Sequence, residues 1–169
     1  EIFSVRALQD FVEVAKANRH LFDILKIHLK VDSGMHRLGI DENDVSRILE
    51  VLGDEKYIRL SSVFTHLAAA DDESHNEFSK NQVTKFSQVA DELEINLEAP
   101  FMRHVLNSSG TLRFPDYQFD MVRLGIGLYG FGNGHHDKHL LALGALKSYI
   151  LQIKHIPAGE SIGYNRAGM

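Results

Sequence analysis

The sequence contains no cysteine, which excludes disulfide bonds and thiolate chemistry from these residues. This absence is compatible with a reducing compartment, and we expect a cytoplasmic protein. No apolar run approaches the length of a membrane span, and no signal peptide is visible, although a truncated start would hide one. The 18 lysine and arginine residues form no basic run, and the net charge is −5. We therefore expect neither nucleic acid nor a membrane as a partner.

With 169 residues, the chain is long enough to bury a sizeable core. It is short for a complete eight-stranded α/β barrel, which takes about 250 residues. Its first residue is Glu1 rather than an initiator methionine. We expect it to be a piece of a longer protein.

Apolar residues recur at helical spacing in three stretches of the chain. Two helices with candidate N-caps are expected over residues 4–18 (Ser4) and 41–52 (Asp41). Ser79 followed by Gln82 is a capping-box pattern, which predicts that a third helix begins at Ser79. The buried stripe of this third helix is expected to comprise Val83, Phe86, Val89, Ala90 and Leu93.

Short apolar stretches between these helices predict strands. The expected strands cover residues 21–29, 58–67, 101–106 and 119–122, with a brief turn or helix start at 108–112. Strands that alternate with helices imply a parallel sheet covered by helices. After Tyr129 the pattern changes, and residues 145–156 alternate as in an antiparallel strand. We place a domain boundary near residue 132.

The stretch from His28 to Gly39 joins an apolar alternation to a glycine-broken loop that holds an acid, a hydroxyl and an arginine. A barrel strand delivers polar groups to its C-terminal rim in this way. On residue types alone, a solvated charge cluster is the more common interpretation, with Gly34 serving only a turn.

The segment from Lys30 to Gly39 resembles the alanine racemases. Their motif at this place has a lysine, an acid, Ser or Thr, Gly, Met, any residue, Arg, Leu and Gly, and every fixed position is filled here. Four further blocks resemble the same family in the same order: Thr65-His66-Leu67-Ala68, Asn107-Ser108-Ser109-Gly110-Thr111, residues 120–130 (DMVRLGIGLYG) and residues 157–164 (PAGESIGY). Five blocks in order, spread over most of the chain, argue against chance similarity.

The resemblance implies a pyridoxal-phosphate-dependent racemase that interconverts L- and D-alanine by a two-base mechanism and supplies D-alanine for peptidoglycan. It implies an α/β fold in which residues 1–131 are the second half of a (β/α)8 TIM barrel. Residues 132–169 would then be a linker and the first strands of a mostly β C-terminal domain. It also implies a homodimer with active sites shared across the interface. The family's Schiff-base lysine lies on the first barrel strand, which is absent here, so we expect the 169 residues alone not to racemise alanine.

Arg123 follows the expected strand over residues 119–122, where an unpaired guanidinium would be costly to bury. On residue types alone, it pairs with Asp120 or faces water. The resemblance makes Arg123 the arginine that donates to the pyridine nitrogen of pyridoxal phosphate and keeps that nitrogen unprotonated. His66 alone would be a core histidine, but it resembles the residue that hydrogen-bonds this arginine and orients it.

Ser108 and the backbone amides at Gly125 and Ile126 resemble the family's phosphate clamp, and Asn107 belongs to the same cofactor-binding block. Residues 125–130 also match the dinucleotide fingerprint G-x-G-x-x-G. That fingerprint requires a helix opening inside it and a strand ending in an acid about 20 residues later. Further helix breakers follow instead, so we reject NAD binding.

Arg37 resembles the arginine that reaches the cofactor's phenolic oxygen and the carboxylate side of the substrate. Lys30 matches a lysine that is carbamylated in several members, where its negative charge positions that arginine. An unmodified lysine would repel Arg37, and Asp32 is able to pair with either cation.

Tyr164 resembles the family's catalytic tyrosine, which projects into the neighbouring subunit's site. It would take or return the α-proton on one face of alanine, which requires a lowered pKa. On residue types alone, Tyr164 is a strand tyrosine packed by its ring. Asn165 and Arg166 depart from the small and hydroxyl residues common after it.

His135, His136 and His139 with Asp137 suggest a metal cluster, but they lie in a glycine-rich loop with no second ligand set at a defined spacing. A solvated linker explains them better, and we expect no metal.

Two alternatives to an alanine racemase stay open. One is a racemase or decarboxylase of the same barrel type that acts on another amino acid, because the cofactor contacts are shared. The other is a pyridoxal-phosphate-binding barrel protein without turnover. Residues 145–164 argue against this second alternative, because such relatives lack a β domain bearing a tyrosine.

Overall fold

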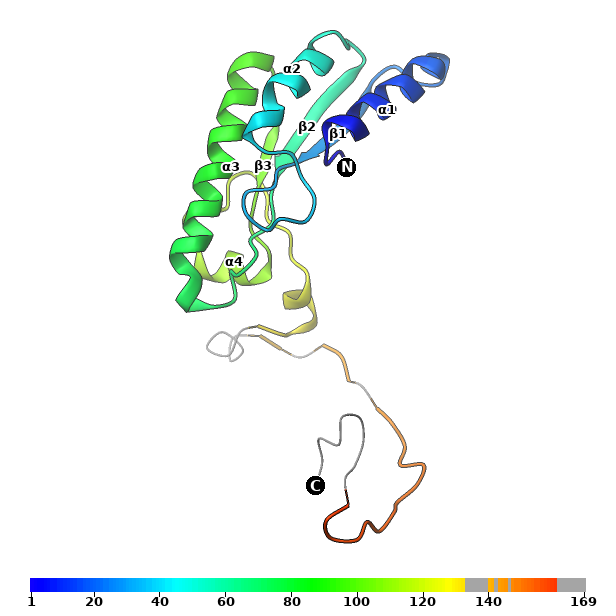
Figure 1. Ribbon diagram of the computed structural model, residues 1–169, viewed down its shortest axis with the longest axis vertical. Coiled ribbons are helices and arrows are strands. Elements are labelled where there is room, and N and C mark those ends of the chain that lie inside the picture. Colours follow the sequence, from blue (N-terminus) through cyan, green and yellow to red (C-terminus); the bar gives the residue numbers. More distant parts are fainter. Residues whose placement is uncertain (133–139, 142, 146, 161–169) are drawn as a thin grey trace.

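A sheet of three parallel strands, in the order β1-β2-β3, forms the centre of the computed structural model, which describes residues 1–132, 140–141, 143–145 and 147–160. The strands are β1 (Leu25–Lys30), β2 (Ile58–Phe64) and β3 (Met102–His104). The α-helices are α1 (Val5–Ala17), α2 (Val45–Gly53), α3 (Asn76–Leu97) and α4 (Ser108–Arg113). The 3-10 helices are η1 (Arg19–Leu21), η2 (Glu42–Asp44), η3 (Glu73–His75), η4 (Pro115–Tyr117) and η5 (Ile126–Tyr129). Helix α2 leads from β1 to β2 and α3 from β2 to β3 (Figure 1), so the predicted parallel sheet with helical connections is confirmed.

Side-chain caps set the starts of the first two helical segments. The Ser4 hydroxyl accepts the Ala7 amide at 3.1 Å, so α1 begins where the sequence predicted. Asp41 and Asp44 form a capping box that opens η2, and the chain continues from there into α2. The acidic cap of the second predicted helix is therefore confirmed, with one turn of 3-10 helix in front of it.

The start predicted for the third helix is wrong. Helix α3 begins at Asn76, directly after η3, whose cap Asp72 accepts the Ser74 amide at 2.8 Å. Ser79 and Gln82 both lie inside α3 and are almost fully buried. The Gln82 side chain bonds to the loop after β2 instead of to the helix backbone. The spacing of Ser79 and Gln82 therefore does not mark a helix start here, and Gln82 connects α3 to that loop.

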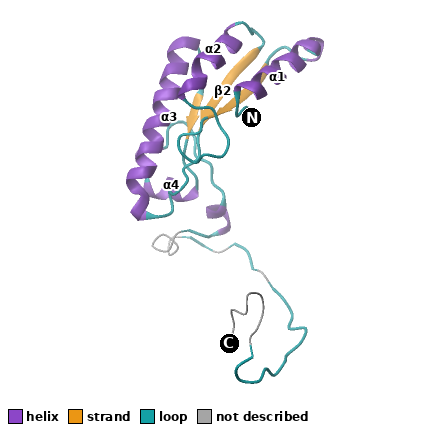
Figure 2. Cartoon of the chain, in the orientation of Figure 1, coloured by secondary structure: helices purple, strands orange, loops and turns teal. Residues whose placement is uncertain are grey.

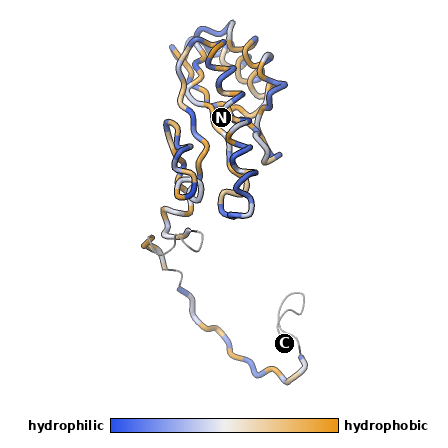
Figure 3. Tube along the Cα trace, turned by 90° about the vertical axis from the view of Figure 1, so that its left-hand side faces the viewer, coloured by the Kyte–Doolittle hydropathy of each residue, from blue (hydrophilic) through white to orange (hydrophobic). Residues whose placement is uncertain are grey.

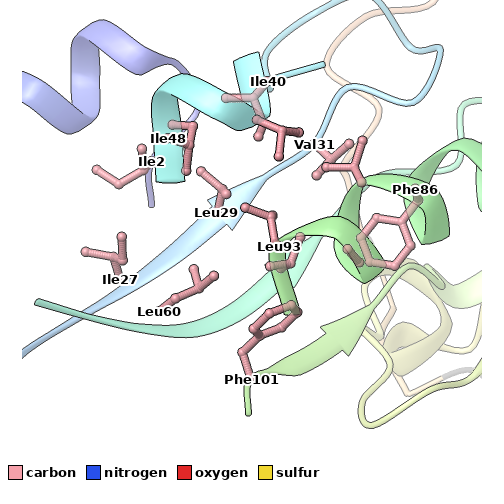
Figure 4. Close-up of a cluster of buried hydrophobic side chains, with 14 of the residues drawn as sticks. Ile2, Ile27, Leu29, Val31, Ile40, Ile48, Leu60, Phe86, Leu93 and Phe101 are labelled. Atoms are coloured by element: carbon pink, nitrogen blue, oxygen red, sulfur yellow. The ribbon is translucent and has the colours of Figure 1, made fainter. Parts of the chain in front are cut away.

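The hydrophobic core lies between the sheet and its helices. Ile27, Leu29 and Leu60 of β1 and β2 belong to one buried cluster with Ile48 of α2 and Leu93 of α3 (Figure 4). Each fully buried apolar side chain of this size contributes about 1.5–3 kcal/mol. Along the helices, hydrophobic and hydrophilic residues alternate (Figure 3), and the predicted stripe of α3 is buried at all five positions: Val83, Phe86, Val89, Ala90 and Leu93.

The opposite face of the sheet is polar. Lys26, His28 and Arg59 alternate with the core residues along β1 and β2 and are exposed. The pairing of β1 with β2 contains an irregularity at this face, because Ile27 pairs with Leu60 whereas His28 pairs with Ser62. One extra residue on β2 is thus skipped, which re-aims the following side chains.

Residues 119–122 do not form the predicted fourth strand. The segment runs beside β3, and the Asp120 amide donates to the Arg103 carbonyl at 3.1 Å. The Arg103 amide, however, donates to the Asp120 carboxylate at 2.7 Å instead of to a backbone carbonyl, which interrupts a strand ladder. Phe119 has a φ of 49°, which a strand residue does not adopt.

The strand predicted over residues 145–156 is also not found in the described part of that range, residues 145 and 147–156. These residues run away from the sheet as loop (Figure 2), and no described strand lies beside them to share a ladder. Their apolar side chains are exposed, for example Ile150 and Leu151.

No helix in the described residues has the length and apolar character that crossing a membrane would take.

The loop after β1, residues 31–40, is closed at its neck by backbone hydrogen bonds. The Asp32 amide donates to the Ile40 carbonyl at 2.8 Å, and the Ile40 amide donates to the Lys30 carbonyl at 2.9 Å. Gly39 sits at this neck with a φ of 140°, and a Cβ there would lie 2.3 Å from the Asp32 nitrogen. Only glycine fits this position.

We predict that Gly39→Ala destabilises the protein by about 2–4 kcal/mol, because the new Cβ collides with backbone and the φ is unfavourable for alanine. The measurement is urea unfolding followed by circular dichroism. Gly53→Ala is the matched control, because a Cβ there meets no atom within 4 Å and Gly53 ends a helix. Equal stability of the two variants would contradict this account of the loop.

Candidate functional site

Polar side chains gather beyond the carboxyl ends of β2 and β3. His66 follows β2, and Ser108 begins α4 shortly after β3. A pocket of about 270 Å³ lies between them. Its lining residues are His66, Asn107, Ser108, Ser109, Arg123, Gly125 and Ile126. Six of these seven were predicted as site residues, and Ser109 is the addition.

The Arg123 guanidinium is held entirely by neutral acceptors. Nη1 donates to His104 Nδ1 at 2.6 Å and to the His104 carbonyl at 3.0 Å. Nη2 donates to the carbonyls of Thr65 at 2.5 Å and Val105 at 3.2 Å. Burial lowers the pKa of Arg123, but from so high a value that it stays a cation. Four of its five N–H groups are thus used, and Nε–H has no acceptor among the described residues.

His104, which the sequence did not single out, supports Arg123 through a relay across all three strands. His104 Nε2 lies 3.0 Å from the Ser62 hydroxyl oxygen, which lies 2.7 Å from His28 Nδ1. The irregular pairing of β1 with β2 places Ser62 opposite His28. The one sequence signal for His104 was a polar, titratable residue in a predicted strand that also holds Arg103.

Counting protons fixes the direction of this relay. Arginine only donates, so His104 Nδ1 must accept and the ring proton must sit on Nε2. The N–H at His104 Nε2 donates a hydrogen bond to the Ser62 oxygen. The Ser62 hydroxyl hydrogen is then free to donate to His28 Nδ1. Burial, followed by Arg123 and His28, lowers the pKa of His104 to about 4, with Asp120 opposing, so the ring is neutral at pH 7.

An aromatic side chain fixes the plane of these groups. The Phe64 ring stacks on His104 with centroids 5.0 Å apart and planes 3° apart. The Arg123 guanidinium lies 5.2 Å from the Phe64 centroid, and Lys30 Nζ lies 5.9 Å from it. Phe64 therefore faces two cations and the one ring that holds Arg123.

His66 lines the same pocket but is not the ring that bonds Arg123. The four bonds of the guanidinium go to His104 and to backbone carbonyls, so the direct bond expected from His66 is not formed here. Burial, then the charges of Arg123, Arg37 and Lys30, lowers the pKa of His66. His66 is therefore a neutral group among cations at pH 7.

Ser108 organises the loop that carries Gly125 and Ile126. Its hydroxyl oxygen accepts the amides of Gly125 at 2.8 Å and Gly127 at 3.1 Å. The hydroxyl hydrogen has no acceptor among the described residues and is available to a ligand. The Ile126 amide, at the first position of η5, has no acceptor within its helix either.

Asn107 lines the pocket, but its side chain also makes two hydrogen bonds within the protein. Oδ1 accepts the Gly110 amide at 2.8 Å and so caps α4, and Nδ2 lies 3.4 Å from the Leu67 carbonyl.

A short 3-10 helix, η5, does begin inside the G-x-G-x-x-G stretch, so the expectation that no helix opens there is corrected. The residues directly before that stretch, 119–124, are not a strand, so it still lacks the dinucleotide-binding context.

The charged residues of the loop after β1 separate in the structure. The Asp32 carboxylate pairs with neither Lys30 nor Arg37, but accepts the backbone amides of Gly34, His36 and Arg37, each at 3.0 Å. Lys30 is nearly buried, with Nζ 3.8 Å from the Glu1 carboxylate, whereas the Arg37 side chain is exposed. The charge of Arg37 nevertheless contributes, after burial and Arg123, to lowering the pKa of His66.

Two groups of predicted residues lie outside the part of the chain that the structure describes. Tyr164 and the two residues after it lie outside the described residues. The same holds for the histidine cluster: His135, His136, Asp137 and His139.

We predict that Asp32→Asn lowers the free energy of unfolding by about 2 kcal/mol at neutral pH, since the amide cannot accept three N–H bonds as the carboxylate does. Partial burial raises the pKa of Asp32, but the three amides outweigh it and hold the pKa below 3.8. This stabilisation is therefore present above pH 3.8 and is lost as the pH falls through the folded-state pKa. Urea unfolding at several pH values measures it, and a difference between wild type and variant that does not shrink in acid would contradict it.

A sequence model described as "Alanine racemase, N-terminal domain" matches residues 2–132. Alanine racemase 1 of Oceanobacillus iheyensis is 34% identical over 96% of this chain and 43% of that protein. The alanine racemase of Streptomyces coelicolor A3(2) superposes with a TM-score of 0.79 at 26% identity, over 98% of this chain and 45% of that one.

A third relative has a stated cofactor. The alanine racemase of Bartonella henselae with covalently bound pyridoxal phosphate superposes with a TM-score of 0.66 at 26% identity, over 83% of this chain and 38% of that one. The chain spans less than half the length of these relatives. The match over residues 2–132 and the extent of the likeness show that the chain belongs to the alanine racemase N-terminal domain family.

Proposed function

We propose that the protein is a cytoplasmic, pyridoxal-phosphate-dependent alanine racemase that interconverts L- and D-alanine, supplies D-alanine for peptidoglycan and works as a homodimer. One observation carries this proposal. Two residues that line the same pocket, Ser108 and Arg123, each keep one strong donor without an acceptor among the described residues. The matching ligand has an anionic group at one end and a neutral acceptor at the other.

Pyridoxal phosphate fits this set of donors. Its phosphate would be held by the Ser108 hydroxyl and the Ile126 amide, which are the unused donors at that end of the pocket. The Arg123 Nε–H would donate to the pyridine nitrogen. When bound, the cofactor withdraws electron density from the α-carbon of an attached amino acid, which is the chemistry that racemisation needs.

Arg123 would keep the ring nitrogen unprotonated, because a guanidinium donates a hydrogen bond without giving up its proton. His104 and the carbonyls of Thr65 and Val105 hold the guanidinium in place for this. Their neutrality leaves the positive charge uncompensated within hydrogen-bond distance. A carboxylate partner would weaken the attraction for the phosphate in the same pocket.

The other family residues receive roles in this proposal. His66 would orient the groups around the ring as a neutral side chain, and Arg37 would reach the phenolic oxygen and the substrate carboxylate. Carbamylation of Lys30 would replace the cation beside Glu1 with an anion that attracts Arg37. Tyr164, from the neighbouring subunit, would transfer the α-proton on one face of alanine.

The fold of the whole protein is part of the proposal. We propose that β1, β2 and β3 belong to an eight-stranded (β/α)8 barrel, and that residues 132–169 begin a mostly β domain. The exposed polar face with Lys26, His28 and Arg59 supports this, because the interior of such a barrel is completed by further strands. The likeness to alanine racemases more than twice as long is consistent with it.

We predict that Ser108→Ala weakens binding of pyridoxal phosphate to the full-length protein by about 10- to 100-fold, the effect of losing one hydrogen bond to a charged group. Binding of pyridoxal, which lacks the phosphate, should not change. Absorbance titration measures both affinities. Ser46→Ala, on the exposed surface of α2, is the matched control. Equal losses for both ligands would contradict a phosphate clamp at Ser108.

We predict that Tyr164→Phe in the full-length protein reduces racemisation of alanine by about 100-fold or more, since it removes a general acid-base. Affinity for pyridoxal phosphate should stay the same. Tyr149→Phe, at a position 90% exposed, is the control. Unchanged turnover would reject the role of Tyr164. Assays with serine, lysine and ornithine test the alternative that the substrate is another amino acid.

A further inference from the structure

The segment after β2, residues 65–68, keeps one backbone bond to β3, because the Thr65 amide donates to the His104 carbonyl at 3.3 Å. Beyond that bond, side chains hold the segment where a strand would be held by another strand. Side chains bond three of its four carbonyls: Arg123 Nη2 bonds that of Thr65 at 2.5 Å, Gln82 Nε2 that of His66 at 3.2 Å and Asn107 Nδ2 that of Leu67 at 3.4 Å. The Ala68 amide donates to Gln82 Oε1 at 2.9 Å. We call these contacts of Arg123, Gln82 and Asn107 with residues 65–68 the side-chain ladder.

Gln82 is the member of the side-chain ladder that makes two of its bonds. The amide group both donates and accepts, as a peptide group in a neighbouring strand would, and it spans the segment on either side of Leu67. It reaches the segment from α3 with a side chain that is 1% exposed. A buried amide of this kind costs several kcal/mol if unbonded, roughly 2–7 on transfer scales, so its two bonds are structurally required.

Gln82 also lies against the glycine loop after β1. A Cβ added at Gly34 would lie 3.4 Å from Gln82 Cγ, so the loop and the side chain pack closely. The same amide group therefore lies between the two loops that carry Arg37 and His66. Neither its capping-box spacing nor its place inside α3 explains a buried glutamine here.

We propose that Gln82 is a positioning residue for His66: by bonding the His66 carbonyl and the Ala68 amide, it holds the His66 ring in the pocket that Arg123 lines. The proposal relies on the proposed function only for what His66 does to a bound ligand. The geometry it describes exists without cofactor or substrate, and both measurements below are made without either. If the protein proved not to be a racemase, the role of Gln82 would be unaffected. If Gln82 proved not to position His66, the proposed racemase function would be unaffected.

The first test compares Gln82→Met with Gln88→Met, an exposed glutamine on the same helix. Methionine keeps the length of the side chain but neither donates nor accepts as an amide does. With the His66 backbone released, its ring gains water and moves away from Arg123, Arg37 and Lys30, which together with burial lower its pKa. NMR titration of carbon-labelled histidine in the full-length protein should show the pKa of His66 rising towards its ordinary value in Gln82→Met and unchanged in Gln88→Met. An unchanged pKa of His66 in folded Gln82→Met would overturn the proposal.

The second test needs no variant, so it decides the matter even if Gln82→Met does not fold. Ala68 is exposed and its amide has no backbone acceptor among the described residues, yet the bond to Gln82 should protect it from hydrogen exchange. Exchange of alanine amides in the unmodified full-length protein measures this directly. Slow exchange at Ala68 supports the proposal, and exchange at the rate of an open chain overturns it.

Discussion

The buried charge of Arg123 is the constraint on which the rest of the site depends. A guanidinium removed from water needs acceptors for its hydrogens, and here four are supplied by neutral groups from two strand ends. Hydrogen bonds to a charged group contribute about 1.5–3 kcal/mol each, so the set offsets the cost of burial. Because Thr65 follows β2 while His104 ends β3, the pairing of these strands fixes where the cation lies.

The neutrality of His104 is as important as its position. A protonated ring would turn an N–H towards Arg123, and the environment prevents this by keeping the ring pKa far below 7. The irregular pairing on β2 brings Ser62 to the face of the sheet that carries His28 and His104. A regular ladder would have put Ser61 opposite His28 and left His104 without its second partner. A local defect in the sheet thereby stabilises the charge at its end.

Much of this arrangement follows from the sequence, and the failures have physical causes. Apolar spacing located three strands and the helices between them, and the family motifs located six residues of one pocket. The segment at residues 119–122 was mistaken for a strand because its apolar pattern does not reveal that the Asp120 side chain occupies the amide of Arg103. The spacing of Ser79 and Gln82 predicts a capping box wrongly, because spacing along a chain does not distinguish a local bond from one to a distant loop. His104 was missed because its role arises only when three strands are side by side.

The way residues 65–68 are held has a consequence for how this region tolerates sequence change. Arg123, Gln82 and Asn107 bond the main chain of the segment, which offers the same groups for every residue except proline. Replacing the side chains of Leu67 or Ala68 therefore leaves every one of these bonds available, whereas replacing any of the three distant anchors removes at least one. We therefore expect this network to limit substitution more at Gln82, Asn107 and Arg123, which span some forty residues of chain, than in the segment that they hold.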